Sequence, residues 1–180
     1  NLVYIAKSLG LDEVSEYWHQ IIKINNYQRE RFAKKIIKSL YGTVSGKKIT
    51  LLGWAFKKNT NDTRESAAIY ITDLLIENGA EIFVYDPKVN KHQMLSDLDY
   101  LNSRSSAENK NSLTYCDEPY IACQDSHAIA VITEWDEFKS FDWERIYQSM
   151  MKPEKVFDGR NILDVKSLEK IGFEVYSIGK

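Results

Sequence analysis

Short apolar runs alternate with amphipathic segments from residue 47 to the end of the chain, and this alternation restricts the fold more than any other feature. Apolar runs bounded by glycine, proline or aspartate predict buried strands, and they cover residues 48–52, 80–85, 128–133, 155–157 and 173–177. Segments with helical spacing lie between them, at residues 62–78, 119–123, 142–151 and 166–171. Strands that alternate with helices form right-handed βαβ units. We therefore expect an α/β fold with a mainly parallel sheet and flanking helices.

A long helix is predicted ahead of this sheet. From Asp12, the expected N-cap, apolar residues recur at steps of three or four as far as Leu40, and Gly42 can supply the left-handed residue that ends a helix. A helix of about 30 residues is about 45 Å long, which exceeds the need of a small domain. We expect a connecting or oligomer-forming element. Two shorter helices broken near Asn25 and Asn26 are the alternative.

The chain therefore divides into two parts. Residues 1–44 form a helical dimerisation and connecting segment, and residues 45–180 form the sheet domain. Residues 1–9 resemble the end of another helix, stopped by Gly10, so we expect the first part to be truncated at its start. Residues 103–112 are almost wholly polar, and we expect them to form a mobile loop.

Composition excludes several classes of protein. The 180 residues carry 24 basic and 26 acidic side chains, a net charge of −2, which argues against binding to nucleic acid. No apolar run has the length of a membrane span, so we expect a cytoplasmic protein with neither membrane segment nor signal peptide. Two cysteines are too few for a disulfide framework or a zinc cluster, and we expect no metal site.

The glycines exclude two phosphate-binding motifs. No two of the eight glycines are separated by a single residue, so the GxGxxG dinucleotide fingerprint is absent from this sequence. The segment from Gly42 to Lys47 is faintly similar to a Walker A loop, but three residues separate its glycines where that loop needs four.

The predicted carboxyl ends of the strands carry the most promising side chains. In open α/β sheets, ligands bind at this edge, where this sequence places residues 53–66, 85–87, 133–135 and 158–160. Lysines, two arginines, aromatic rings and a helix start, predicted at Asp62 with Glu65 as its capping partner, suit an anionic ligand with a flat ring. The alternative is that Lys57 and Lys58 are an ordinary solvated loop.

Other candidates are weaker. Asp86 could hold a ribose, but without the glycine fingerprint a turn-forming role before Pro87 is favoured. His127 and the cysteines, Cys116 and Cys123, lack the partners of a nucleophile or general base. The four tryptophans are expected to be packing anchors.

These motifs resemble the UDP-glucose 6-dehydrogenases of the UDP-glucose/GDP-mannose dehydrogenase family. The run GWAFKKNTNDTRES at residues 53–66 is similar to the family segment GFAFKKDTGDTRES. The strand-end segments YDP, TEW and FDGR follow in the family's order, and residues 1–4 and 26–29 also resemble it. The resemblance covers essentially all 180 residues.

The resemblance implies a fold and an activity. It implies a Rossmann-like, C-terminal UDP-sugar-binding domain after a helix that builds a homo-oligomer. The family oxidises the C6 alcohol of UDP-glucose to UDP-glucuronate in two steps with NAD. By motif, Phe56, Lys57 and Arg160 correspond to contacts with the UDP-sugar, and Arg64 corresponds to a residue that reaches NAD. A segment tied to oligomer assembly corresponds to Ser39, Leu40, Tyr41, Gly42 and Thr43.

The sequence also departs from the family pattern. Trp54 replaces a phenylalanine, Asn59 an acid and Asn61 a glycine, and we expect Asn61 to adopt a left-handed backbone and Trp54 to crowd the site slightly. The family's NAD loop and catalytic cysteine have no counterpart here. We expect a C-terminal portion of the enzyme, with no catalytic residue of its own and inactive alone.

Three alternatives remain. The chain could belong to another nucleotide-sugar 6-dehydrogenase, acting on GDP-mannose or a UDP-N-acetyl sugar. It could be a nucleotide-sugar-binding module without chemistry, which its opening inside a helix disfavours. A generic structural domain of the same fold would not explain the cationic residues at the strand ends.

Overall fold

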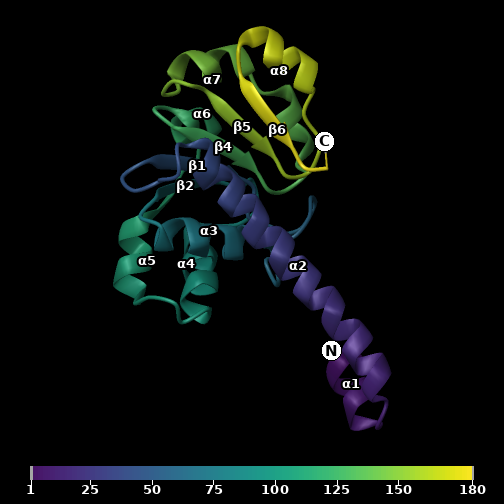
Figure 1. Cartoon of the computed structure of the whole chain (residues 1–180). Coiled ribbons are helices and arrows are strands. Elements are labelled where there is room, and N and C mark those ends of the chain that lie inside the picture. The colour runs from purple at the N-terminus through teal and green to yellow at the C-terminus, as the bar shows by residue number, and fades with distance from the viewer. Residues whose placement is uncertain (1, 180) are drawn as a thin grey trace.

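The computed structural model describes residues 2–179 and contains a single parallel sheet within that range (Figure 1). Its six strands lie in the order β3-β2-β1-β4-β5-β6, and every adjacent pair is parallel. The strands are β1 (Lys48–Leu52), β2 (Glu81–Tyr85), β3 (Leu113–Tyr115), β4 (Ala128–Val131), β5 (Lys155–Asp158) and β6 (Glu174–Ser177). The expected α/β fold is confirmed.

Among residues 2–179, two helices precede the sheet, and the others follow its strands. They are α1 (Leu2–Ser8), α2 (Asp12–Ser39), α3 (Ala67–Glu77), α4 (Lys91–Tyr100), α5 (Ser106–Ser112), α6 (Pro119–Cys123), α7 (Trp143–Ser149) and α8 (Val165–Ile171), with a 3-10 helix η1 (Asp136–Ser140). From β1 the chain builds β2 and β3 on one side, then returns to build β4, β5 and β6 on the other. The strand order therefore reverses between β1 and β4, which is where α/β sheets bind ligands.

The core lies around the three central strands. Nearly every residue of β1, β4 and β5 is buried, as expected for strands covered on both faces. The second half of α2 adds Phe32, Ala33 and Ile36 to this core, and the ring of Phe32 meets that of Phe157 edge-on at 6.4 Å. Each large apolar side chain buried in this way contributes about 1.5–3 kcal/mol. This packing fixes α2 beside the ends of β4 and β5.

The long helix is continuous. α2 spans 28 residues with no break near Asn25 or Asn26, so the two-helix alternative is wrong. Its first half projects away from the sheet with α1 packed against it (Figure 1). The predicted N-cap is also wrong: Asp12 is already helical, and Leu11 precedes it without a side-chain cap. The packing of α1 against α2 holds this end instead of a capping hydrogen bond.

The segment proposed for oligomer assembly ends α2. Leu40 is buried, and Tyr41 and Gly42 both have a left-handed backbone, with φ of 65° and 81°. Gly42 closes the helix as expected by donating its N–H to the carbonyl of Ile37. The ammonium of Lys47 donates to the carbonyls of Leu40 and Thr43 at 2.7 and 2.9 Å, which satisfies the helix end.

The start of α3 differs from the sequence expectation. α3 begins at Ala67 with Ser66 as its N-cap, so the helix start at Asp62 is wrong. Glu65 has a φ of 60°, a left-handed conformation that a helix cannot contain. The side chain of Asp62 instead accepts hydrogen bonds from Arg64.

The polar segment 103–112 contains a helix, not the expected loop. Ser105 and Glu108 form a reciprocal capping box that starts α5. Its residue Asn109 is buried and donates to Asp99 at the end of α4. Side-chain hydrogen bonding replaces apolar packing in α5, and for this reason a hydrophobic pattern missed this helix. α4 and the short β3 were also not predicted.

Candidate functional site

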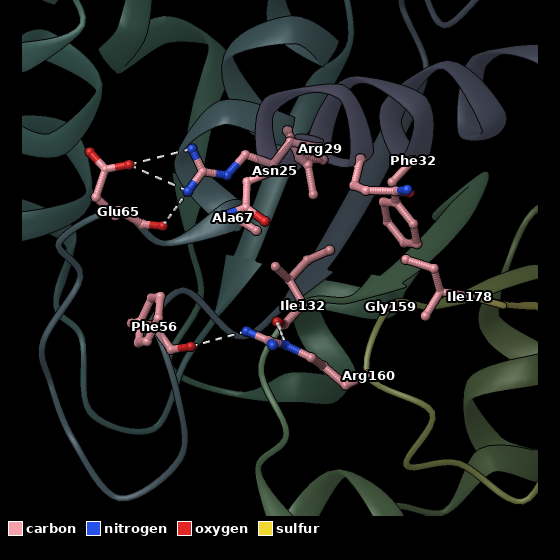
Figure 2. Close-up of a pocket in the computed structure, with 12 residues that line it drawn as sticks. Asn25, Arg29, Phe32, Phe56, Glu65, Ala67, Ile132, Gly159, Arg160 and Ile178 are labelled. Atoms are coloured by element: carbon pink, nitrogen blue, oxygen red, sulfur yellow. Dashed lines mark hydrogen bonds and ion pairs between the residues drawn. The ribbon is translucent and has the colours of Figure 1, made fainter. Parts of the chain in front are cut away.

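A pocket of about 300 Å³ lies where α2 crosses the carboxyl ends of the central strands (Figure 2). Arg29 and Phe32 of α2 form one wall, and Ile132, Gly159 and Arg160 after β4 and β5 form the other. Phe56, from the loop after β1, stands at the rim and is 47% exposed. The pocket thus combines an apolar floor with two guanidinium groups on facing walls.

Close packing brings the strand ends together beneath this pocket. Gly53 ends β1 with a φ of 99°, and a Cβ atom there would lie 2.4 Å from the Cβ of Thr133. The hydroxyl of Thr133 donates to the carbonyl of Ala55 at 2.7 Å. Only glycine fits this approach, so the loops after β1 and β4 are held against each other.

Arg160 links three strand ends. Its Nε donates to the carbonyl of Ile132 at 2.6 Å, and its Nη2 donates to the carbonyl of Phe56 at 3.0 Å (Figure 2). Glu134 lies 3.3 Å from the same Nε, and its other carboxylate oxygen accepts from the N–H of Lys58. The structure therefore brings Phe56 and Arg160 together, as predicted, in a partly buried setting where charge-assisted hydrogen bonds are strong.

The two remaining predicted residues lie outside the pocket. Lys57 is exposed and does not line it. The side chain of Arg64 is 87% exposed and forms a two-point contact with Asp62, which holds the pKa of that carboxyl at about 2 through hydrogen bonding. Lys58 pairs with Asp136 at 2.7 Å, so it is not simply solvated.

Arg29 was not predicted as a site residue, although it lies in the segment 26–29 that carries part of the family resemblance. It occupies the wall facing Arg160, and its Nη2 donates to the carbonyl of Glu65 at 2.8 Å. Its guanidinium stacks on the ring of Tyr70 at 4.1 Å. The sequence feature that could have identified Arg29 is its place three residues before Phe32, on the same face of the helix.

Asp86 acts as a turn former, as favoured from the sequence. One carboxylate oxygen accepts from the backbone N–H groups of Lys88 and Val89, each at 2.9 Å. The other accepts from the N–H groups of Trp54 and Ala55 at 2.6 and 3.0 Å. Because both carboxylate oxygens accept hydrogen bonds from the protein itself, the role of Asp86 is structural.

The departures from the family pattern do not disturb the pocket. Trp54 is fully buried, is absent from the pocket wall and donates its indole N–H to Asp97 at 2.8 Å, so the expected crowding is wrong. Asn59 has a left-handed backbone in this loop, with a φ of 64°, whereas Asn61, which we expected to adopt it, does not. Asparagine tolerates that conformation better than most residues, so Asn59 suits the turn.

Neither cysteine suits nucleophilic chemistry. Burial raises the pKa of the Cys123 thiol to about 12 and also raises that of Cys116. His127 accepts the N–H of Lys48 on Nδ1, which ties it to the start of β1. Across residues 2–179 no group of three or more potential ligands could hold a metal ion. In the same range, no helix is both long and apolar enough to cross a bilayer.

The fold and the pocket define a Rossmann-like α/β domain with a pocket lined by two arginines at its topological switch point. Residues 50–165 match the model of the UDP-glucose/GDP-mannose dehydrogenase family, UDP binding domain. The chain belongs to this family.

Relatives and solved structures agree with this membership. The UDP-glucose 6-dehydrogenase of Drosophila melanogaster is 51% identical over 181 residues, and UDP-glucose 6-dehydrogenase 4 of Arabidopsis thaliana is 48% identical over 191. Both matches cover the whole chain, which spans 38% and 39% of those relatives. A UDP-glucose dehydrogenase from Pyrobaculum islandicum superposes with a TM-score of 0.65 at 25% identity, covering 97% of this chain and 34% of its own.

Within residues 2–179, the structure contains no dinucleotide cradle of the glycine-rich type. The turn after β1 holds Gly53 against Thr133, and no GxGxxG sequence follows it. The helix after this turn starts only at Ala67, and the hydroxyl of Ser66 already accepts one of its N–H groups. The described residues therefore supply no glycine-rich NAD site for a hydride-transfer step.

Proposed function

We propose that this chain is the UDP-binding part of a UDP-glucose 6-dehydrogenase. The convergence of Phe56 and Arg160 on one pocket at the strand-order reversal carries the proposal. A guanidinium fork binds phosphate oxygens through paired, charge-assisted hydrogen bonds, and a half-exposed ring offers a stacking face. The identity of 48–51% to enzymes of that name supports UDP-glucose over other nucleotide sugars.

The proposed reaction oxidises the sugar C6 alcohol twice, with NAD as the acceptor. This chain binds and orients the UDP-sugar through Phe56, Lys57 and Arg160, and Arg64 reaches toward NAD from the exposed rim of the same loop. The nucleophile and the main NAD site belong to the rest of the enzyme, since neither cysteine here is suitable. We propose a cytoplasmic enzyme whose 180-residue portion is inactive alone.

We also propose that the enzyme is a homo-oligomer built through the long helix. Residues 2–27, from α1 through the following turn into α2, expose a run of large apolar side chains: Leu2, Ile5, Leu9, Leu11, Val14, Tyr17, Ile21, Ile22, Ile24 and Tyr27. A surface of this kind marks an interaction site. Because α2 also lines the pocket through Arg29 and Phe32, the shape of the pocket then depends on how this helix is held in the assembly.

Binding of nucleotides to the purified chain tests the proposal. Equilibrium dialysis is expected to show binding of UDP and UDP-glucose, with GDP a poor competitor. Lys57→Ala and Arg160→Ala are each expected to weaken binding by about 1–3 kcal/mol, the range for a lost charge-assisted hydrogen bond. Arg145→Ala is the matched control, because Arg145 stacks on Tyr120 away from the pocket. Equal binding of GDP, or unchanged affinity in both variants, contradicts the proposal.

A further inference from the structure

Arg29 holds one residue of the ligand loop from two directions. Its Nη2 donates to the carbonyl of Glu65 at 2.8 Å, and both terminal nitrogens lie 3.4 Å from the carboxylate oxygen Oε2 of Glu65 (Figure 2). The other carboxylate oxygen accepts the hydroxyl of Tyr70 at 2.9 Å, and the ring of Tyr70 lies under the guanidinium. These three residues form a closed set of contacts, which we call the Arg29 clasp.

The residue held by the clasp has an unfavourable backbone. Glu65 has a φ of 60°, which costs roughly 1–2 kcal/mol for a residue with a Cβ atom. Such conformations persist only where surrounding contacts enforce them. The side chain of Arg29 is 16% exposed and that of Glu65 is 70% exposed, so the arginine is the more firmly packed partner of this contact.

Glu65 joins the loop that carries Phe56 and Lys57 to the start of α3. Three residues before it, the backbone carbonyl of Asp62 accepts the N–H of Phe56 at 2.8 Å, which closes the loop that carries Phe56 and Lys57. Immediately after it, Ser66 caps α3 and is fully buried. A change in the backbone conformation of Glu65 therefore redirects the loop that runs from the pocket rim to the fixed start of α3.

We infer that Arg29 is a positioning residue: it keeps Glu65 in the left-handed conformation and so fixes the loop of residues 56–65 for ligand binding. The inference rests on the proposed function, because that loop is the one proposed to bind the UDP-sugar. It also gives α2 a direct connection to the pocket, since the same helix carries the exposed apolar run.

Two variants separate this role from ordinary helix packing. Arg29→Gln removes the charge and the fork but keeps a long side chain. Adding Glu65→Gly to Arg29→Gln removes the backbone strain, because glycine adopts a positive φ without a steric penalty. Arg31→Gln is the control, since Arg31 lies on the same helix and contacts Gln28 instead of the loop.

Hydrogen exchange of the 180-residue chain gives a readout that requires no activity. Exchange in residues 62–70 is expected to rise about fivefold in Arg29→Gln, equivalent to about 1 kcal/mol, and to stay unchanged in Arg31→Gln. The double variant is expected to recover at least half of this change. Unaltered exchange, a rise that extends equally to residues 155–165, or a double variant without recovery overturns the clasp.

UDP affinity, measured by equilibrium dialysis on the same proteins, completes the test. We expect the dissociation constant for UDP to rise about three- to tenfold in Arg29→Gln, about 0.7–1.4 kcal/mol, and to recover in the double variant. Full affinity in Arg29→Gln overturns the positioning role. A wild-type chain that binds no UDP contradicts the proposed function, while the exchange data still confirm or overturn the clasp.

Discussion

The indole N–H of Trp135 donates to the carboxylate of Asp86 at 3.1 Å, joining the loop after β4 to the end of β2. The same carboxylate oxygen accepts the backbone N–H groups of Trp54 and Ala55 after β1. One buried side chain therefore ties together three strand ends, and its partners lie up to 49 residues from it in the sequence. The pocket rim depends on this junction because Phe56 follows Ala55 directly.

Replacing this carboxylate by an amide is expected to destabilise the domain. In Asp86→Asn one end of the side chain becomes a donor and faces N–H groups that need an acceptor. Unpaired buried donors cost about 1–3 kcal/mol each, so we expect a loss of about 2–4 kcal/mol in the free energy of unfolding, measured by urea denaturation. Asp136→Asn, at an exposed site, is the control and should change stability little. Equal stability of the two variants contradicts the junction.

The close approach at Gly53 predicts a second large effect. Gly53→Ala places a Cβ atom in collision with the Thr133 side chain and backbone, in addition to imposing a φ of 99° on alanine. Gly46→Ala is matched to it, since Gly46 also has a positive φ, of 67°, but has nothing within 4 Å of the added atom. Thermal denaturation should show a loss of about 1–2 kcal/mol for Gly46→Ala and a clearly greater loss for Gly53→Ala. Similar losses would mean that steric contact with Thr133 is unimportant.

The contact between Arg64 and Asp62 predicts a specific pH response. The pKa of Asp62 is lowered from 3.8 to about 2 in the folded chain. A lowered carboxyl pKa stabilises the folded state fully above pH 3.8, and this contribution disappears as the pH falls toward 2. Carbon-13 NMR titration should give a midpoint near 2 for Asp62, rising toward 3.8 in Arg64→Ala. A midpoint unchanged by that substitution contradicts the contact.

The exposed apolar run on α2 predicts self-association. Ile24 is 58% exposed on the projecting half of the helix, and Ile24→Lys introduces a charge into the proposed interface. Sedimentation velocity should show a dimer or larger species for the wild-type chain and a shift toward the monomer of 20.9 kDa in this variant. Ile121→Lys serves as control, because Ile121 is 60% exposed on α6, outside the helical segment. A wild-type monomer at high concentration contradicts the interface.

The elements that the sequence predicts correctly are those with their own apolar pattern. The strand at residues 128–131 is a continuous apolar run and that at residues 48–52 is mostly apolar, as burial on both faces requires. β3 has three residues, too short for a pattern, and α5 is held by polar contacts such as that between Asn109 and Asp99. Those contacts join α5 to a neighbouring helix and are not visible in local spacing.

The candidate site was predictable where it follows the strand ends. Phe56 and Arg160 meet because parallel strands bring their carboxyl ends to one edge, a rule that requires only the strand assignment. Arg29 meets Glu65 across 36 residues, through the angle at which α2 crosses the sheet. That angle results from core packing at Phe32 and Ile36, which no local pattern specifies. The division into segments 1–44 and 45–180 stays a prediction.

The most direct test of the proposed function is catalysis by a hybrid enzyme. The segment of the Drosophila melanogaster UDP-glucose 6-dehydrogenase that aligns with this chain is replaced by these 180 residues, and NADH formation from UDP-glucose is followed by absorbance. The proposed function predicts a folded hybrid that forms NADH with UDP-glucose but not with GDP-mannose, and that loses substrate affinity in Arg160→Ala. A folded hybrid with the parent's circular dichroism and no NADH formation would contradict it.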